Sequence, residues 1–396
     1  MKHSILVMTI ALAGLSVSPV NAGEWDITGF VGVDTRTFWQ EAAFDDQASR
    51  VDASLLLQPE FYWNNDDQRV SIVGFARADL QDSERSHADL RQAYWAIERS
   101  SWDLVLGLDK VFWGVTESRH LVDVINQTDL VEDIDGEAKL GQPMLNLNIQ
   151  RDYGRFGLFV LPYFRERTFP GAAGRLRTPL PVDTDNPEYE STNKEQHVDY
   201  AFRYSHYLGD LDIGIHWFDG TSRESRFQVS ADGNRLIPIY DLMTQTGIDL
   251  QYTRDAWLWK LEAISRDTRV DSFAAVAAGF EYTLYGVRES AIDVGLLFEY
   301  LYDGRDAASP PTPFDDDVFI GTRIALNDAE DTSLLAGIAV DLDNQETFLN
   351  IEAERRFGDS IVAEFRLRAF ANAATDGALL PFAQDDYAEL RLSWYY

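Results

Sequence analysis

Apolar and polar residues alternate along much of this chain, in stretches of about ten residues. In the last stretch, 388–396, the even positions are apolar or aromatic, and Glu389, Arg391 and Ser393 lie between them. The stretch 361–369 shows the same alternation. A period of two is that of a β-strand with one apolar and one polar face, so the pattern predicts an all-β protein.

The number of such stretches sets the size of the sheet. We expect about 18 strands, with about 16 as the nearest alternative, and boundaries that move by about 2–4 residues. The expected strands are 25–39, 51–63, 69–80, 88–99, 102–113, 143–152, 155–164, 196–208, 210–220, 241–254, 256–266, 271–285, 290–303, 315–326, 331–341, 346–357, 360–371 and 385–396.

The connections between these strands alternate in length. Short ones such as 100–101 and 358–359 alternate with long ones such as 114–142, 165–195 and 372–384. This layout is typical of an outer-membrane barrel with short periplasmic turns and long extracellular loops. We therefore predict a transmembrane, antiparallel, up-and-down β-barrel. An even number of strands places the N-terminus and the C-terminus of the barrel at the same end, on the periplasmic side.

The N-terminal residues have the pattern of a secretory signal. A basic start precedes an apolar stretch over 5–15, and a small-residue cleavage pattern ends at Ala22. Such an apolar stretch is too short to span a bilayer as a helix. We therefore predict a signal peptide over 1–22 and a barrel over 23–396, in the outer membrane of a Gram-negative bacterium.

The chain is strongly acidic, with a net charge of −32, and it has no cysteine. The charge argues against nucleic acid as a partner, because its phosphates would repel the protein. It does not argue against a membrane, because charged loops stay outside the hydrocarbon. Without cysteine the chain forms neither a disulfide nor a thiolate metal site, and we expect no cofactor and no bound metal.

The C-terminal residues 392–396 are rich in aromatic side chains. They resemble the terminal aromatic strand of bacterial outer-membrane proteins. The resemblance implies recognition by the barrel-assembly machinery. Most members of that group end in Phe, whereas this chain ends in Tyr396.

A second resemblance covers about 103–170. There a strand is expected to end in the pair Trp113-Gly114, and the Asp- and Asn-rich segment 123–129 follows. This region is similar to a poorly characterised family of proteobacterial porin-like proteins. The similarity implies the fold and the location more than an activity.

The connection 114–142 combines many charged residues with apolar ones, such as Val124 and Ile125, that need burial. It follows the fifth expected strand, as does the inward-folded loop of general porins, which it resembles in position. We predict that it enters the lumen and narrows it, where its acidic character would attract cations. The alternative is an extracellular loop packed on its neighbours. The candidate constriction residues are Trp113, Gly114, Glu117, Arg119, Asp123, Asn126, Asp129 and Asp133.

The polar faces of the strands carry both signs of charge. Such charges either create a transverse field across a pore or form a structural network that braces the wall. The candidate lumen-lining residues are Arg77, Arg203, Arg323, Glu352, Glu364, Arg366, Arg368, Glu389 and Arg391.

The tight turn at 358–359 also predicts strand register. Counting back from it sets Glu352 opposite Arg366 and Glu354 opposite Glu364. Such opposed charges would help to set the register of neighbouring strands. Across the longer loop that follows, the expected neighbours are Arg368 with Glu389 and Arg366 with Arg391.

The expected function is diffusion of small hydrophilic solutes through an outer-membrane channel. A barrel of about 16–18 strands is too wide for side chains alone to fill, so it leaves an aqueous path unless it is plugged. A transporter for hydrophobic substrates is the alternative, and it would need an apolar lane. A barrel hydrolase is a further alternative, but no histidine lies in a nucleophile motif and we do not expect an enzyme. Expected partners are the solutes, outer-membrane lipid, lipopolysaccharide, and further copies of the chain in a homotrimer. The acidic loops either are simply solvated or bind divalent cations that bridge to lipopolysaccharide phosphates.

Overall fold

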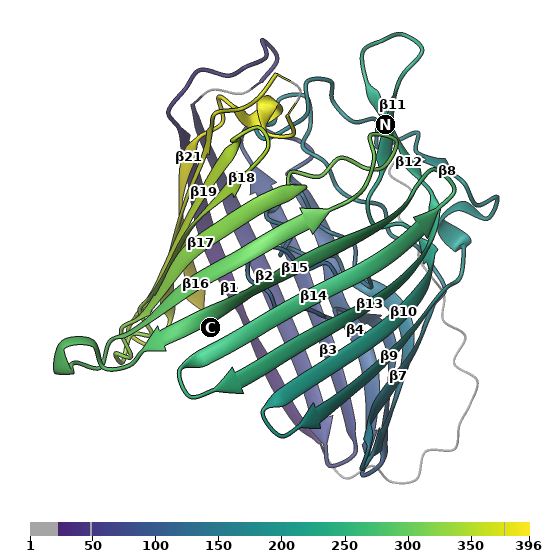
Figure 1. The fold of residues 1–396 in the computed structure, drawn as a ribbon, viewed down its shortest axis with the longest axis vertical. Helices are drawn as coiled ribbons and strands as arrows, with labels where there is room; N and C mark the ends of the chain where they lie inside the picture. Colours follow the sequence, from purple (N-terminus) through teal and green to yellow (C-terminus); the bar gives the residue numbers. More distant parts are fainter. Residues whose placement is uncertain (1–22, 48–49, 376) are drawn as a thin grey trace.

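The protein is a single closed β-barrel, shown in Figure 1. The computed structural model describes residues 23–47, 50–375 and 377–396. The expected signal peptide, 1–22, lies outside the described residues. The 18 wall strands are β1 (Glu24–Phe38), β2 (Val51–Asn65), β3 (Gln68–Asp79), β4 (His87–Arg99), β5 (Trp102–Asp109), β6 (Gln142–Arg151), β7 (Gly154–Leu161), β9 (Asp199–Leu208), β10 (Leu211–Thr221), β13 (Leu242–Arg254), β14 (Trp257–Thr268), β15 (Ser272–Leu284), β16 (Asp293–Asp303), β17 (Asp316–Ala325), β18 (Ser333–Asp341), β19 (Thr347–Phe357), β20 (Ile361–Ala371) and β21 (Tyr387–Tyr395).

Each wall strand pairs antiparallel with the strands on either side of it in the chain, and the last strand closes on the first. Phe30 of β1 lies opposite Tyr395 of β21, and Phe38 lies opposite Tyr387. Closure leaves no sheet edge with unpaired backbone groups, which a bilayer does not tolerate. The predicted antiparallel barrel of about 18 strands is confirmed.

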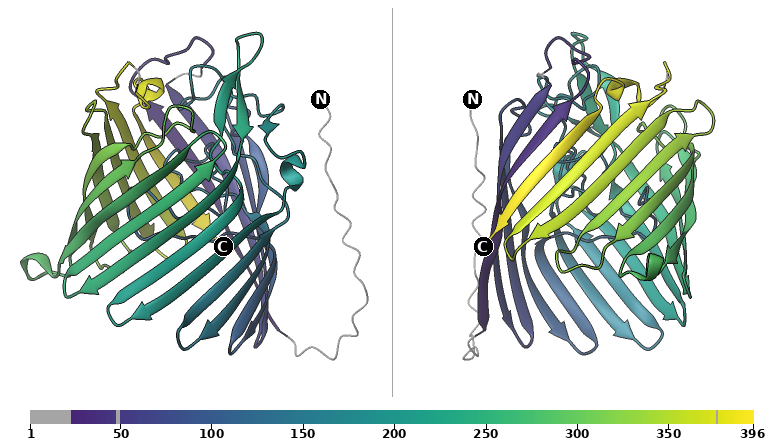
Figure 2. Two further views of the ribbon diagram at one scale, coloured as in Figure 1. Left: turned by 45° about the vertical axis from the view of Figure 1, so that its right-hand side comes forward. Right: turned by 90° about the vertical axis from the view of Figure 1, so that its left-hand side faces the viewer.

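The connections divide by length between the two ends of the barrel (Figures 1 and 2). At one end, hereafter the short-turn end, the turn after β2 is only Asp66 and Asp67. At the other, hereafter the long-loop end, 110–141 and 162–198 join neighbouring wall strands. Glu24, where β1 begins, pairs with Asn64 beside the short turn. The start of the first wall strand and the end of the last therefore both lie toward the short-turn end, as predicted.

A small second sheet lies among the long loops. It consists of β8 (Glu188–Tyr189), β11 (Arg226–Val229) and β12 (Leu236–Tyr240), none of which was predicted. These strands are too short, or too weakly alternating, to show the period of two. The three short 3₁₀ helices are Lys194–Gln196, Val287–Glu289 and Leu380–Phe382. No helix among the described residues is long and apolar enough to cross a membrane.

The two faces of the wall differ as the alternation predicts. On β21, Leu390, Leu392 and Trp394 point outward and are 48%, 49% and 53% exposed. Glu389 and Ser393, which alternate with them, point inward and are buried. An apolar outer surface around a charged interior is stable only when the outside faces hydrocarbon, so the barrel is a transmembrane one.

Strand β5 ends earlier than the sequence predicts. It stops at Asp109 rather than near Trp113. The Asp109 carboxylate accepts the N–H of Lys110, and its carbonyl accepts a hydrogen bond from the side chain of Asn126. These bonds turn the chain into the lumen, so the aromatic residues after Asp109 lie outside the strand.

The tight turn after β19 gives the predicted register. Glu352 pairs with Arg366, and Glu354 pairs with Glu364. Across the longer loop the prediction was wrong by two residues, because Arg366 and not Arg368 pairs with Glu389. The loop contains a helical turn, and Asp386 accepts the N–H of Phe370, neither of which the sequence shows.

This shift of two residues keeps every side chain on its predicted face, because the period of a strand is two. It changes the partners on the lumen face. Arg391 now lies opposite Glu364 rather than Arg366, so opposite charges replace the like-charged contact that was expected.

Cysteine labelling tests which face of β17 meets water. We expect Arg323→Cys to react with a small charged thiol reagent in intact membranes, because Arg323 points inward. Ile320→Cys should resist the reagent, because Ile320 is 56% exposed on the outer face. The native chain has no cysteine and serves as the unlabelled control. Labelling at 320 with protection at 323 would invert the two faces.

Candidate functional site

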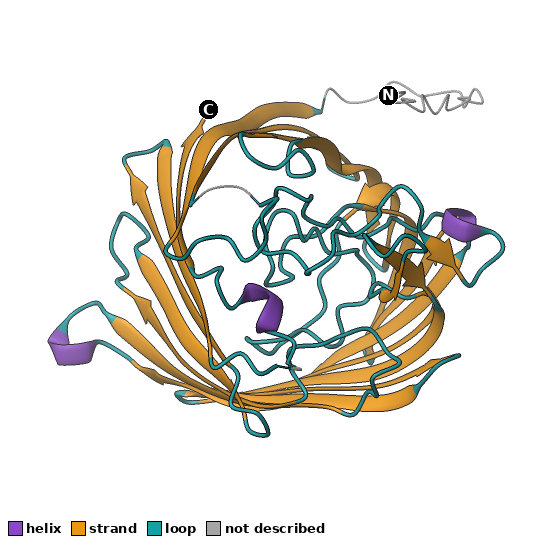
Figure 3. Ribbon diagram, turned by 90° about the horizontal axis from the view of Figure 1, so that it is seen from above, coloured by secondary structure: helices purple, strands orange, loops and turns teal. Residues whose placement is uncertain are grey.

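The connection between β5 and β6, residues 110–141, enters the barrel and is hereafter the lumen loop. Seen from above, loops cross the space inside the ring of strands (Figure 3). Trp113, Val122, Val124 and Ile125 of this loop are buried in one apolar cluster with inward side chains of the wall. The wall members of the cluster are Met144, Phe159, Leu161, Ala201, Phe218, Met243, Ile264, Ala275, Ala277 and Leu301. The apolar residues of this acidic segment thus find their burial inside the barrel.

The base of the lumen loop is closed by Asn126. Its Oδ1 accepts the N–H of Val111 at 2.8 Å, and its Nδ2 donates to the carbonyls of Asp109 and Leu140, each at 2.9 Å. One side chain therefore ties the start of the loop to its end. Asparagine suits this role because its amide both donates and accepts.

The pair Trp113-Gly114 has a physical explanation in this loop. The ring of Trp113 is buried against Phe159 and His216, with centroids 5.5 and 5.4 Å apart. Gly114 has φ of +153°, and a Cβ there would lie 2.8 Å from Nδ1 of His120. Both the backbone conformation and the close approach require glycine.

Two wall carboxylates hold the first half of the lumen loop by its backbone. Glu262 of β14 accepts the N–H groups of Val115, Thr116 and Val122 at 2.7, 3.1 and 3.1 Å. Glu299 of β16 accepts the N–H groups of residues 117 and 118 at 2.7 and 2.8 Å. Hydrogen bonds to an ionised acceptor are stronger than neutral ones, so these glutamates fix the path of the loop.

The second half of the loop is held by arginines of other strands. Arg91 of β4 contacts Asp129 at 2.6 Å. Arg77 of β3 binds Glu132, and Arg368 of β20 binds Asp133 at 3.0 Å. The lumen loop therefore crosses the barrel, from β14 and β16 to β3, β4 and β20.

Behind this contact lies a buried charged network of the wall itself. Arg77 also binds Asp34 and Ser54, and Arg36 binds Glu389. Arg391 lies 3.4 Å from Asp34. These side chains point into the barrel, but they bind one another. This is the bracing network that the sequence left open as an alternative.

A large cavity remains on the other side of the lumen loop, and hereafter we call it the passage. Its volume is about 1690 Å³, and it lies between the loop and the inward faces of β17–β20. The predicted site residues that line it are Glu117, Arg119, Asp123, Asn126, Arg323, Glu352, Glu364, Arg366 and Arg368. The predicted site residues outside its lining are Trp113, Gly114, Asp129, Asp133, Arg77, Arg203, Glu389 and Arg391.

The passage residues are partly paired across the lumen. Glu117 of the lumen loop contacts Arg323 at 2.6 Å and Lys260 at 3.6 Å. Arg119 contacts Asp303 at 2.8 Å, and its guanidinium lies over the ring of Phe314. Arg203, by contrast, binds Asp249 at 2.8 Å and packs on Trp113 on the far side of the loop.

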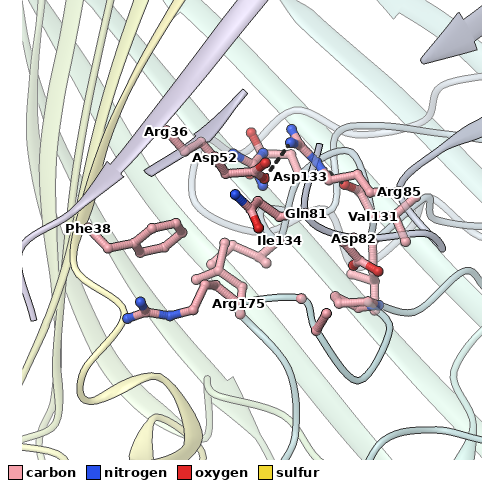
Figure 4. A pocket seen from close by; sticks show the side chains of 15 residues that line it. Arg36, Phe38, Asp52, Gln81, Asp82, Arg85, Val131, Asp133, Ile134 and Arg175 are labelled. Carbon is pink, nitrogen blue, oxygen red and sulfur yellow. Dashed lines mark hydrogen bonds and ion pairs between the residues drawn. The ribbon is translucent and has the colours of Figure 1, made fainter. Parts of the chain in front are cut away.

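A second, much smaller cavity lies between the lumen loop and the first strands (Figure 4). Its volume is about 20 Å³, and its lining includes Arg36, Asp52, Arg85 and Ile134. This volume suits about one water molecule. It is part of the packing and not a site for a solute.

Sequence reasoning missed Glu262 as a site residue, although this side chain accepts three backbone N–H groups of the lumen loop. The sequence did contain a signal for this residue, because Lys260, Glu262 and Arg266 have the same parity in β14 and so share one face of the strand. In the structure all three are buried. Parity shows that a charge points inward. It does not show that three backbone N–H groups meet that charge.

His87, Asp129 and Glu132 form the one group among the described residues with the spacing of a metal site. His87 Nε2 lies 3.8 Å from Asp129 Oδ2 and 3.6 Å from Glu132 Oε1. Both carboxylates already bind arginines, Asp129 with Arg91 and Glu132 with Arg77. The group therefore serves better as a contact between wall and loop than as a cation site.

His120 lies in the lumen loop between two glutamates. Its Nε2 is 2.9 Å from Glu137 and its Nδ1 is 3.8 Å from Glu262. Burial lowers the pKa of His120, but the two carboxylates outweigh burial and raise the pKa to about 10. The imidazolium is therefore the form that holds the loop at neutral pH.

Comparison with known proteins rests on structure, since no family model and no curated protein matches the sequence. Wzi of Escherichia coli, described as an outer-membrane protein involved in group 1 capsule assembly and a carbohydrate-binding β-barrel, is similar at a TM-score of 0.55 and 11% identity, over 92% of this chain and 83% of that one. OccK3 of Pseudomonas aeruginosa is similar at a TM-score of 0.52 and 13% identity, over 94% of this chain and 95% of that one. The fold is that of an outer-membrane β-barrel. At these identities the likeness extends to the fold alone.

Replacement of Glu262 by glutamine tests the wall-to-loop attachment. Each hydrogen bond to a charged acceptor contributes about 1.5–3 kcal/mol, so we expect the N–H groups of residues 115, 116 and 122 to exchange with deuterium at least about tenfold faster. Hydrogen–deuterium exchange measures this directly. Glu281→Gln is the matched control, because Glu281 faces the lumen from β15 and its nearest cation among the described residues is Arg323, at 3.9 Å. Equal exchange in both variants would rule out this role of Glu262.

The protonation of His120 gives the loop a pH dependence. Its pKa in the folded protein is about 10, above the ordinary 6.5, so its stabilising contribution is complete below pH 6.5 and is lost as the pH rises through 10. We expect the unfolding temperatures of the native protein and of His120→Gln to converge between pH 7 and pH 11. A difference that stays constant over this range would contradict the assignment.

Proposed function

We propose that this protein is an outer-membrane channel through which small hydrophilic solutes diffuse along the passage. The observation that carries the proposal is the extent of the passage. At the long-loop end its lining includes 305–313 and 377–379, and at the short-turn end it includes Ala325 and Ser333. The last two residues flank the turn between β17 and β18, so the cavity follows the wall from one end toward the other.

The lining favours polar solutes. Arg323, Glu352, Glu354 and Arg366 line the passage on its wall side. Glu354 is exposed, and no ion pair involves it among the described residues. Charges that meet water in a pore favour hydrated solutes over apolar ones.

Transport of hydrophobic substrates is less well supported. Phe319, Ala339 and Phe348 lie on the passage wall, but they pack against one another and against Phe314 in a cluster. The patch continues from Phe348 to Phe370 and Leu379 at the long-loop end. Toward the short-turn end, Arg323, Glu352 and Glu354 interrupt it, so it does not form a lane through the whole passage.

We also propose that the protein is not an enzyme. His120 lies between carboxylates, and His216 contacts Gln245 and Trp113. No histidine of the described chain is hydrogen-bonded to a serine hydroxyl, the first contact that a serine hydrolase requires. The homotrimer, the contacts with lipopolysaccharide and the barrel-assembly machinery stay predictions.

Conductance in planar bilayers tests the channel. We expect the native protein to conduct ions and Leu335→Trp to conduct less, because Leu335 lines the passage and a larger ring would fill part of it. Ile338→Trp on the same strand is the control, because Ile338 is 38% exposed on the outer face. A correctly folded native barrel that carries no current would overturn the proposal.

A further inference from the structure

We infer that the long-loop half of the passage contains a binding site for an anionic group, a carboxylate or a phosphate, formed by Arg119, Arg167, Arg266 and Arg305. The inference rests on the proposed function, because it names the class of solute that would pause on its way through the channel. It depends on four observations: the convergence of the arginines, the stacking of three of them on aromatic rings, their carboxylate partners, and the position of Arg167 outside these ion pairs.

Four separate segments bring these arginines to one cavity. Arg119 belongs to the lumen loop, Arg167 to the connection after β7, Arg266 to the end of β14, and Arg305 directly follows β16. All four line the passage. No local sequence pattern joins them, so only the closed barrel creates the cluster.

Aromatic rings hold the guanidinium groups in place. Arg266 and Arg305 both lie over the ring of Phe273, at 5.6 and 4.9 Å from its centroid. Arg119 lies 5.8 Å from the centroid of Phe314. A guanidinium stacked on a ring presents its donors at the edge, which suits it to planar recognition of carboxylate or phosphate.

The protein's own carboxylates already use this cluster. Glu224 binds Arg266 and lies 3.3 Å from Arg305. Asp303 contacts Arg119 and Arg305, both at 2.8 Å. Burial alone would raise the pKa of Glu224, but the surrounding arginines hold it well below its usual range.

Arg167 takes no part in these ion pairs. Arg167 forms no ion pair within the described parts of the chain, and its Nε donates to the amide oxygen of Gln127 at 3.2 Å. It is half-buried, and burial lowers its pKa. The nearby charge that favours its cationic form is Glu224, which already pairs with Arg266 and Arg305. An anion that enters the passage therefore gains a direct contact with Arg167.

The four arginines lie in the long-loop half of the passage. Both halves carry both signs of charge, because Asp306, Asp315 and Asp317 also line the long-loop half, and Arg323 lies with Glu352, Glu354 and Glu364 toward the short-turn end. The site is therefore local to the guanidinium groups, at Arg167.

Direct binding to the purified barrel in neutral detergent tests the site. Isothermal titration calorimetry at low ionic strength would use benzoate and inorganic phosphate as separate probes, because salt screens such contacts. We expect the native protein to bind at least one of them, and Arg167→Gln to bind it about tenfold more weakly, because a charged hydrogen-bond donor is lost. Arg167→Lys, which keeps the charge without the planar donors, should fall between the two.

Arg269→Gln is the control for loss of charge at the same end of the barrel. Arg269 is exposed and lies outside the lining of the passage, so its removal should leave binding unchanged. Binding of benzoate alone would assign the site to carboxylates, and binding of phosphate alone would assign it to phosphates.

Failure of this inference and failure of the channel are distinguishable. A preparation that conducts ions but binds neither probe, or binds them equally in Arg167→Gln, overturns the anion site and leaves the channel intact. If a preparation binds an anion through Arg167 but carries no current, the anion site is supported and the channel proposal is overturned.

Discussion

The structure depends on one constraint: charges enclosed in the barrel must find opposite charges or hydrogen-bond donors. The inward face of the wall carries both signs, and so does the lumen loop. Glu262 and Glu299 satisfy backbone N–H groups of the loop, and Arg77, Arg91 and Arg368 satisfy its carboxylates. An unpaired charge inside would be costly, so wall and loop stabilise each other.

This pairing also determines the shape of the open space inside the barrel. A barrel of 18 strands encloses more volume than side chains can fill. The lumen loop packs its apolar residues on one side of the wall and leaves the other side open. The residues that line this open side include Arg167 and Glu354.

The site was predictable in part. Parity placed Arg77, Arg368 and Glu389 inside, because the period of a strand is fixed by its geometry. Parity did not show that their partners are Glu132, Asp133 and Arg36, which lie far away in the chain. Such pairings depend on how the barrel closes and on the path of the lumen loop.

The sequence by itself determined the wall strands and their faces, and it limited their number to about 16–18, because each follows from local alternation and from the lengths of the connections. It also determined the register across the tight turn at 358–359, where two residues leave the chain little freedom. Across the longer loop before β21 the tertiary structure decided the register, since a helical turn and the Asp386 side chain set how much chain the loop absorbs. The tertiary structure alone decided which charges brace the wall and which meet water, because that depends on contacts between segments that only the closed barrel brings together.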